Sequence, residues 1–139
     1  MADLDAGTTR VVRPLSPHLQ IYRPMLTMLM SIAHRITGAA LYFGMALLAW
    51  WLLAAASGPN AYAVFTWFLG TVIGKLILFG YTWALIHHML GGIRHLIWDT
   101  LHGFEPAERE RLALATIAGS IALTLLIWVA GYFAMGGPR

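Results

Sequence analysis

Long stretches without charge constrain this chain more than any other feature of its sequence. Residues 36–56 and 112–137 carry no charged side chain, and residues 62–98 are apolar for most of their length. A helix of about 20 mainly apolar residues is long enough to cross the hydrocarbon core of a membrane. The sequence therefore predicts an all-α integral membrane protein, a single domain over residues 1–139. The three transmembrane helices are expected at about 28–56, 62–98 and 108–136.

The composition agrees with this prediction and excludes several functions. Hydrophobic residues make up 59% of the chain and charged residues 11%, whereas soluble domains contain about 25% charged residues. The net charge of +3 includes no long basic run, so nucleic acid is not an expected partner. Cysteine is absent, which excludes disulfides, iron–sulfur ligation by this chain and covalent haem attachment. Any metal or haem would therefore be held by histidine, methionine or carboxylate.

The first 27 residues are expected to form a cytoplasmic segment. Its start, residues 1–5, is acidic and lacks the order of a secretory signal or a transit peptide. Ser16 and Pro17 are typical of a helix start, so a short interfacial helix is predicted to end near Tyr22, before Pro24. An irregular basic linker is the alternative.

Basic residues predict the orientation in the membrane. They are concentrated before the first span and around the second loop, while residues 57–61 contain none. By the positive-inside rule, the N-terminus and the second loop are expected in the cytoplasm and the C-terminus in the periplasm. The predicted location is a bacterial inner membrane. The arginines concerned are Arg10, Arg13, Arg23, Arg35, Arg94, Arg109 and Arg111.

Residues 86–99 hold three of the six histidines and are the main candidate for chemistry. His88 and His95 are seven residues apart and share one helix face with Gly92, which would let a large flat ligand or another helix approach. His87 points about a quarter turn away. Antiparallel spans should bring this stretch level with a cluster in the first span. The residues of this predicted layer are Ser31, His34, Arg35, His88, Arg94, His95 and Asp99.

A haem would suit this layer, because neutral imidazole is a common axial ligand and arginines can neutralise propionates. His88 is expected to lie deeper than His34 and His95, among hydrocarbon. The alternative is that His88 only hydrogen-bonds a neighbouring helix. Three helices do not enclose a large ligand well, so a partner bundle is also predicted. His18, His87 and His102 are interpreted as surface or packing residues.

Ser31 and Arg35 share a helix face and could together bind the carbonyl oxygen of a quinone. A helix-start serine and an interfacial arginine are the structural alternative. Lys75 interrupts the second span, and its ammonium is expected to snorkel to the outer interface. A small transporter or channel subunit, using Lys75 and the histidines as a relay, is a competing interpretation.

Three motifs carry a resemblance over most of the chain. RPLSPHLxIY at 13–22, SIxHRxTG at 31–38 and HxxxGIRHxxWD at 88–99 resemble the cytochrome b large membrane-anchor subunits of succinate dehydrogenase (complex II). The resemblance implies a non-catalytic anchor that passes electrons from succinate oxidation to ubiquinone. It also implies three partners: a small anchor subunit, an iron–sulfur subunit and a flavoprotein subunit. The iron–sulfur clusters and FAD would lie on those partners.

The same resemblance implies roles for individual residues. His88 would be one axial ligand of a non-covalent haem b, with the second ligand on the small anchor subunit. Ser31 and Arg35 would line the ubiquinone site. His34 would lie near the haem propionates, and propionate or quinone-site support is expected from Arg94, His95 and Asp99. His34 as a second ligand within the chain, menaquinone in place of ubiquinone, and a purely structural haem anchor stay open as alternatives.

Overall fold

The computed structural model describes residues 14–136, which form helices and short connections only. A short 3₁₀ helix, η1 (Pro17–Leu19), precedes α1 (Leu26–Ser57), α2 (Pro59–Gly70), α3 (Val72–Asp99) and α4 (Pro106–Ala134). Helices α1, α3 and α4 are long and apolar enough to cross a membrane. The predicted all-α class with three spans is therefore confirmed.

The N-terminal helix is shorter than the sequence suggested. The Ser16 hydroxyl accepts a hydrogen bond from the His18 amide at 3.3 Å, and Pro17 occupies the first helical position. These two residues start the helix as expected. The helix nevertheless ends at Leu19 rather than Tyr22, and its side chains are exposed. Residues 1–13, including the predicted acidic start, lie outside the described part of the chain.

The second predicted span, 62–98, is two helices rather than one. Thr71 has an extended backbone, with ψ 159°. Its hydroxyl accepts a hydrogen bond from the Gly74 amide at 3.0 Å and so caps α3. A side chain at Gly74 would collide with the backbone of Phe68, so glycine permits the close turn between α2 and α3. Hydropathy does not register this break, because apolar residues continue through it.

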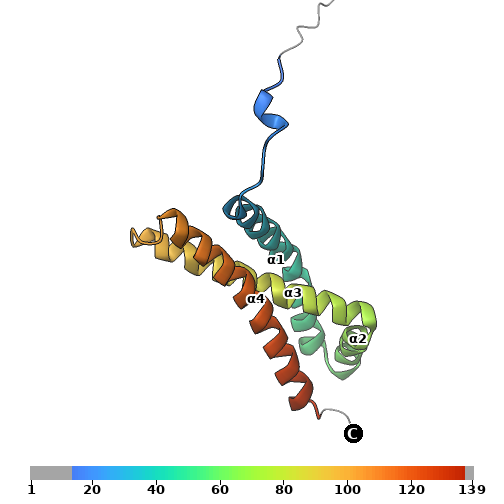
Figure 1. Ribbon diagram of the computed structural model, residues 1–139. Helices are drawn as coiled ribbons and strands as arrows, with labels where there is room; N and C mark the ends of the chain where they lie inside the picture. Colours follow the sequence, from blue (N-terminus) through green and yellow to red (C-terminus); the bar gives the residue numbers. More distant parts are fainter. Residues whose placement is uncertain (1–13, 137–139) are drawn as a thin grey trace, which may run out of the picture.

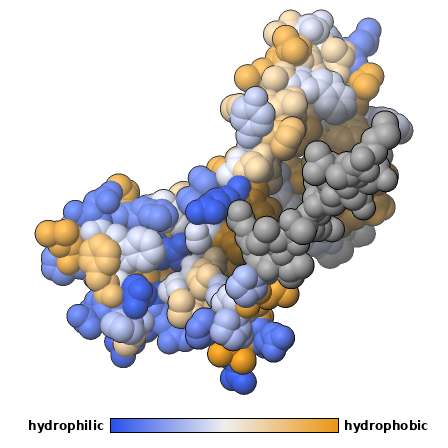
Figure 2. Space-filling view, turned by 90° about the horizontal axis from the view of Figure 1, so that it is seen from above, coloured by the Kyte–Doolittle hydropathy of each residue, from blue (hydrophilic) through white to orange (hydrophobic). Residues whose placement is uncertain are grey.

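The connection between α3 and α4 is short and fastened by its own side chains. The Trp98 indole donates a hydrogen bond to the Gly103 carbonyl at 3.1 Å, and Gly103 has φ 81°, which favours glycine. Pro106 starts α4, close to the predicted residue 108. The start of α4 includes the charged residues Glu105, Glu108 and Arg109. Figure 2 shows hydrophilic residues gathered at this end of the molecule.

The long helices cross one another rather than forming a parallel bundle. In Figure 1, α1 crosses α3, while α4 lies along the C-terminal half of α3 and then diverges from it. Small polar residues on α4 are buried against neighbouring helices, which allows close approach within a membrane; they are Thr116, Ser120 and Thr124. In α1 only 6% of the most apolar window is buried, against 22% in α3 and in α4. Most of the surface of α1 is therefore available to lipid or a partner.

Candidate functional site

Two distant parts of the sequence meet where α1 crosses α3. The imidazole rings of His34 and His88 stack face to face, with centroids 3.9 Å apart and planes 5° from parallel. The predicted meeting of the two clusters is confirmed. Because the centroids are only 3.9 Å apart, any difference in depth between the two rings is less than one helical turn; that His88 is the deeper ring stays a prediction.

The stacking also decides how the two imidazoles can act together. To hold one metal together, two imidazoles would each have to aim a ring nitrogen at it. Rings that lie flat against each other cannot do so. As stacked here, His34 and His88 are not arranged to bind one iron together, and a second ligand within this chain stays an untested alternative.

The His88 ring is held by hydrogen bonds through one of its two nitrogens. Nδ1 of His88 lies 3.2 Å from the carbonyl oxygen of His34 and 3.4 Å from the hydroxyl of Thr37. The Thr37 hydroxyl donates to the backbone carbonyls of Ala33 and His34 at 2.9 and 3.0 Å, so its oxygen can accept from His88. Both neighbours favour a proton on Nδ1, which leaves the lone pair of Nε2 free to bind a metal.

Glycines shape the space around the stacked rings. A side chain at Gly91 would collide with the His34 ring, and one at Gly38 would place Cβ 3.0 Å from Cε1 of His88. These two glycines let the helices come close enough for the rings to meet. Gly92, one turn beyond His88, has no atom within 4 Å of its Cβ position. The backbone beside His88 is therefore open to a flat ligand.

The other residues of the predicted layer differ in burial. His95 is exposed, 5.4 Å from the His34 ring and 5.1 Å from the Trp98 ring between centroids. Arg94 is only 5% exposed, and its guanidinium lies 5.1 Å from the Trp98 ring centroid. Its Nε is buried without a hydrogen-bond partner. Asp99 is exposed at the last residue of α3.

His87, next to the central histidine, faces α4 instead. It is 2% exposed, and its Nδ1 lies 3.2 Å from the Ser120 hydroxyl. The ring also packs near Trp83, with centroids 5.1 Å apart. His18 and His102 are exposed. These positions agree with the interpretation of the three histidines as packing or surface residues.

Ser31 and Arg35 lie on α1 on either side of His34 in sequence, and both are exposed. Spacings of three and four residues place all three on one side of the helix. The hydroxyl and the guanidinium therefore face outward beside the histidine cluster, where a molecule from outside this chain can reach them.

Thr37 is the residue of this site that sequence reasoning did not single out. It is 2% exposed and touches the central histidine. Its position one turn after His34 was visible, but its partner is 51 positions away. Nothing in a single sequence fixes which face of α1 meets α3.

The site suits a haem better than a bare metal ion. In residues 14–136 no group of three histidine or carboxylate side chains is arranged to hold a metal ion. One imidazole with a free Nε2, beside an open glycine, matches the needs of an axial ligand and a flat macrocycle.

Comparison with known proteins shows extensive similarity. The family model for the succinate dehydrogenase/fumarate reductase transmembrane subunit matches residues 9–127. The succinate dehydrogenase cytochrome b556 subunit of Paracoccus denitrificans is 45% identical over 126 residues, which cover 91% of this chain and 94% of that protein. The corresponding subunit of Rickettsia felis is 38% identical over 84% of this chain and 91% of its own. The mitochondrial cytochrome b560 subunit of Sus scrofa is 45% identical over 82% of this chain and 71% of its own.

Proposed function

This chain belongs to the succinate dehydrogenase/fumarate reductase transmembrane subunit family, as a membrane cytochrome b subunit of succinate dehydrogenase, and we propose that it binds haem b and contributes to ubiquinone reduction. It is a subunit of an enzyme complex and is not catalytic alone. The single observation that carries the proposal is the crossing of α1 and α3, where His88 is oriented beside His34.

His88 is the proposed axial ligand of the haem iron. The His34 carbonyl, which accepts from Nδ1 at 3.2 Å, holds the ring so that Nε2 can face the metal, as second partners of ligating histidines commonly do. The other ligand is proposed to come from the small membrane-anchor subunit. The bound haem would supply a one-electron redox centre within the membrane layer.

Residues around the ligand are proposed to support the propionates or the quinone site. His34 stacks on the His88 ring with centroids 3.9 Å apart, and the His95 ring centroid lies 5.4 Å from that of His34. Arg94 adds a positive charge to the same layer. Its buried Nε–H group has no hydrogen-bond acceptor among the described residues. Asp99 is at the water-facing end of α3 in the proposed orientation.

Ser31 and Arg35 are the proposed quinone-binding residues. Both are exposed on one side of α1, so a lipid-soluble molecule can reach them. The Ser31 hydroxyl would donate a hydrogen bond to a quinone carbonyl. The Arg35 guanidinium would stabilise the negative charge that develops on the quinone oxygen during reduction, in a layer where water is sparse and such stabilisation is strong. Protons would enter from the water on the same side.

The proposal includes the surroundings of the subunit. The iron–sulfur clusters are expected on a partner subunit, because this chain has no cysteine to bind them. The iron–sulfur and flavoprotein subunits are expected on the cytoplasmic side, because electrons must arrive beside Arg35. We place the chain in a bacterial inner membrane, with its N-terminus in the cytoplasm and its C-terminus in the periplasm. The poorly buried surface of α1 is available to the small anchor subunit.

Replacement of Arg35 by glutamine tests the quinone site in the intact complex. We expect ubiquinone reduction with succinate to fall about 100-fold, as when one charge-stabilising donor is removed. Succinate oxidation with an artificial acceptor should stay intact. Arg111→Gln is a matched control, because Arg111 is also exposed but lies on α4. Unchanged quinone kinetics in Arg35→Gln would contradict the proposed quinone site and favour a purely structural haem anchor.

A further inference from the structure

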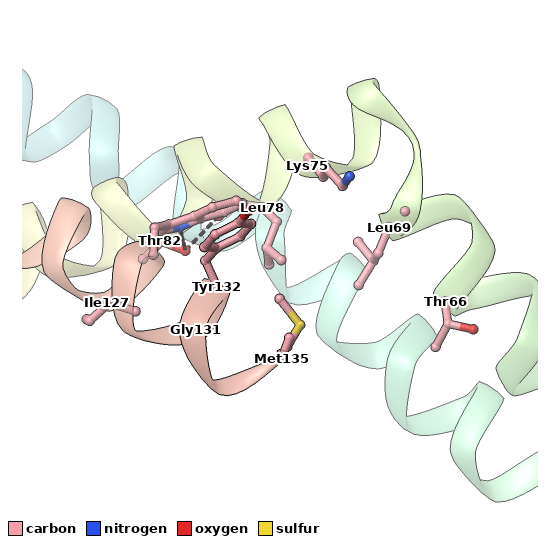
Figure 3. A pocket seen from close by; sticks show the side chains of 11 residues that line it. Thr66, Leu69, Lys75, Leu78, Thr82, Ile127, Gly131, Tyr132 and Met135 are labelled. Carbon is pink, nitrogen blue, oxygen red and sulfur yellow. Dashed lines mark hydrogen bonds between the residues drawn. The ribbon is translucent and has the colours of Figure 1, made fainter. Parts of the chain in front are cut away.

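A groove lies where α3 and α4 diverge, on the opposite end of α3 from the cluster around His95. Its volume is about 650 Å³, within the range of roughly 300–1,000 Å³ that ligand pockets occupy. Figure 3 shows its walls, to which α2, α3 and the end of α4 all contribute side chains. The break between α2 and α3 at Thr71 brings α2 to this wall.

The lining of the groove is mostly apolar, and the polar groups of Trp128 and Thr82 within it are already paired. The Trp128 indole donates to the Thr82 hydroxyl at 3.4 Å, and this hydroxyl donates to the Leu78 carbonyl at 2.7 Å. Leu69 and Met135 contribute apolar surface from other walls. The interior therefore offers a surface for a hydrocarbon chain and little for a polar molecule.

Lys75 gives the groove a positive charge that this part of the chain does not balance. It is the one charged residue between Arg35 and Arg94 in the sequence, and it is exposed in the first turn of α3. Among the described residues that line the groove, none is acidic. The next acidic side chain along α3, Asp99, is 24 residues away, about 36 Å along a helix.

We propose that this groove binds an anionic phospholipid of the surrounding membrane. The phosphate would lie beside the Lys75 ammonium, which a flexible stem brings to the level of the headgroups. An acyl chain would follow the apolar wall formed by α2, α3 and α4. The match is one of charge and shape: an unbalanced cation at the end of an apolar groove is complementary to an anionic headgroup with a hydrocarbon tail. The site is independent of the haem and quinone proposals.

The test uses the complete complex, stripped of lipid in neutral detergent and titrated with phosphatidylglycerol or phosphatidylcholine, with bound lipid counted by native mass spectrometry. We expect one site that prefers phosphatidylglycerol. Lys75→Gln should weaken its binding about fivefold, the effect of one cation near a membrane surface, whereas Lys75→Arg should retain it.

Filling the groove provides a second variant. Gly131 lines the groove and has no atom within 4 Å of its Cβ position, so Gly131→Leu should occupy the space and abolish the site. Gly80→Leu is the matched control, since Gly80 is equally open but is not part of the groove. Equal affinity for the two lipids, or lipid binding that both Lys75→Gln and Gly131→Leu leave unchanged, would overturn the proposal. So would a groove that a partner helix already fills in the complex.

Discussion

His87 and His88 are neighbours in sequence but belong to opposite environments. His88 faces α1, where its ring stacks on His34 and the backbone beside it is open at Gly92. His87 faces α4, where it is 2% exposed and pairs with Ser120. One step along a helix turns a side chain by about 100°, which is enough to separate a candidate ligand from a packing residue. The role of a histidine in α3 therefore depends on the helix face that it occupies rather than on its residue type.

The two faces are also built from different residues. Towards α1, glycine at position 91 makes room for an imidazole. Towards α4, the small hydroxyl residues Ser120 and Thr124 are fully buried and donate to carbonyls of their own helix. The α1 face thus keeps an imidazole available. On the α4 face the hydroxyls bond within their own helix, while Nε2 of His87 is buried without a hydrogen-bond partner among the described residues.

The strongest test of this difference replaces each histidine in turn. His88→Ala should remove nearly all haem b from the complex, because the axial ligand is lost. His87→Ala should keep haem near the wild-type level, since the hydrogen-bond partner of His87 within residues 14–136 is Ser120 on α4, away from the α1 face. The measurement is the reduced haem absorbance per flavin in the purified complex. Similar haem content in the two variants would contradict the assignment of the faces.

A second test crowds the α1 face. Gly91→Leu should displace the His34 ring, because even a Cβ atom at this position collides with it. Overpacking of this kind costs about 2–3 kcal/mol, and we expect a lower Tm of the complex together with altered haem spectra. Gly80→Leu should change neither, because the space around Gly80 is open. An unchanged Tm in Gly91→Leu would mean that the helices do not approach as closely as described.

A third test weakens the α4 face alone. Ser120→Ala leaves Nδ1 of His87 without its partner in a buried position, which should reduce the free energy of unfolding by about 1 kcal/mol. Thermal unfolding of the complex would report this loss, while the haem spectrum should stay the same. Ser57→Ala is the control, because Ser57 is exposed and its hydroxyl donates to the Leu53 carbonyl of its own helix. A changed haem spectrum in Ser120→Ala would show that the two faces are coupled.

The smallest expected effect concerns Thr37. Thr37→Val removes an acceptor 3.4 Å from Nδ1 of His88, which should make the ligand slightly less basic and raise the haem midpoint potential. A long hydrogen bond worth about 0.5 kcal/mol corresponds to roughly 20 mV for a one-electron couple. A redox titration of the complex measures this shift. Thr66→Val, on the exposed side of α2, should produce none, and a shift to lower potential would contradict the role of Thr37.

The three spans and the meeting of the two histidine clusters could be predicted from the sequence, because both depend on hydropathy and on the antiparallel order of the helices. The break at Thr71 could not, since it depends on one capping hydroxyl inside a continuous apolar run. The sequence also placed His88 deeper than His34, because each depth was judged from nearby charges. The closeness of the two rings depends on their stacking beside Gly91, which charge positions in the sequence do not reveal.

Contacts between helices were the other limit of prediction. Which side of α1 meets α3 depends on crossing geometry, which a single sequence does not contain. Thr37 and the pairing of His87 with Ser120 were therefore beyond reach, although both lie within segments that were placed well. Lys75 was noticed as an interruption, but the groove beside it arises only from the divergence of α4.

The start of α3 at Val72 has a consequence for proton supply. This helix of 28 residues is about 42 Å long, whereas the hydrocarbon core is about 30 Å thick. Even without tilt, roughly two turns of α3 therefore extend beyond the hydrocarbon core. In the proposed orientation this excess lies at the Asp99 end, so the last turns of α3 would extend into water and protons could reach exposed His95 without crossing the hydrocarbon core.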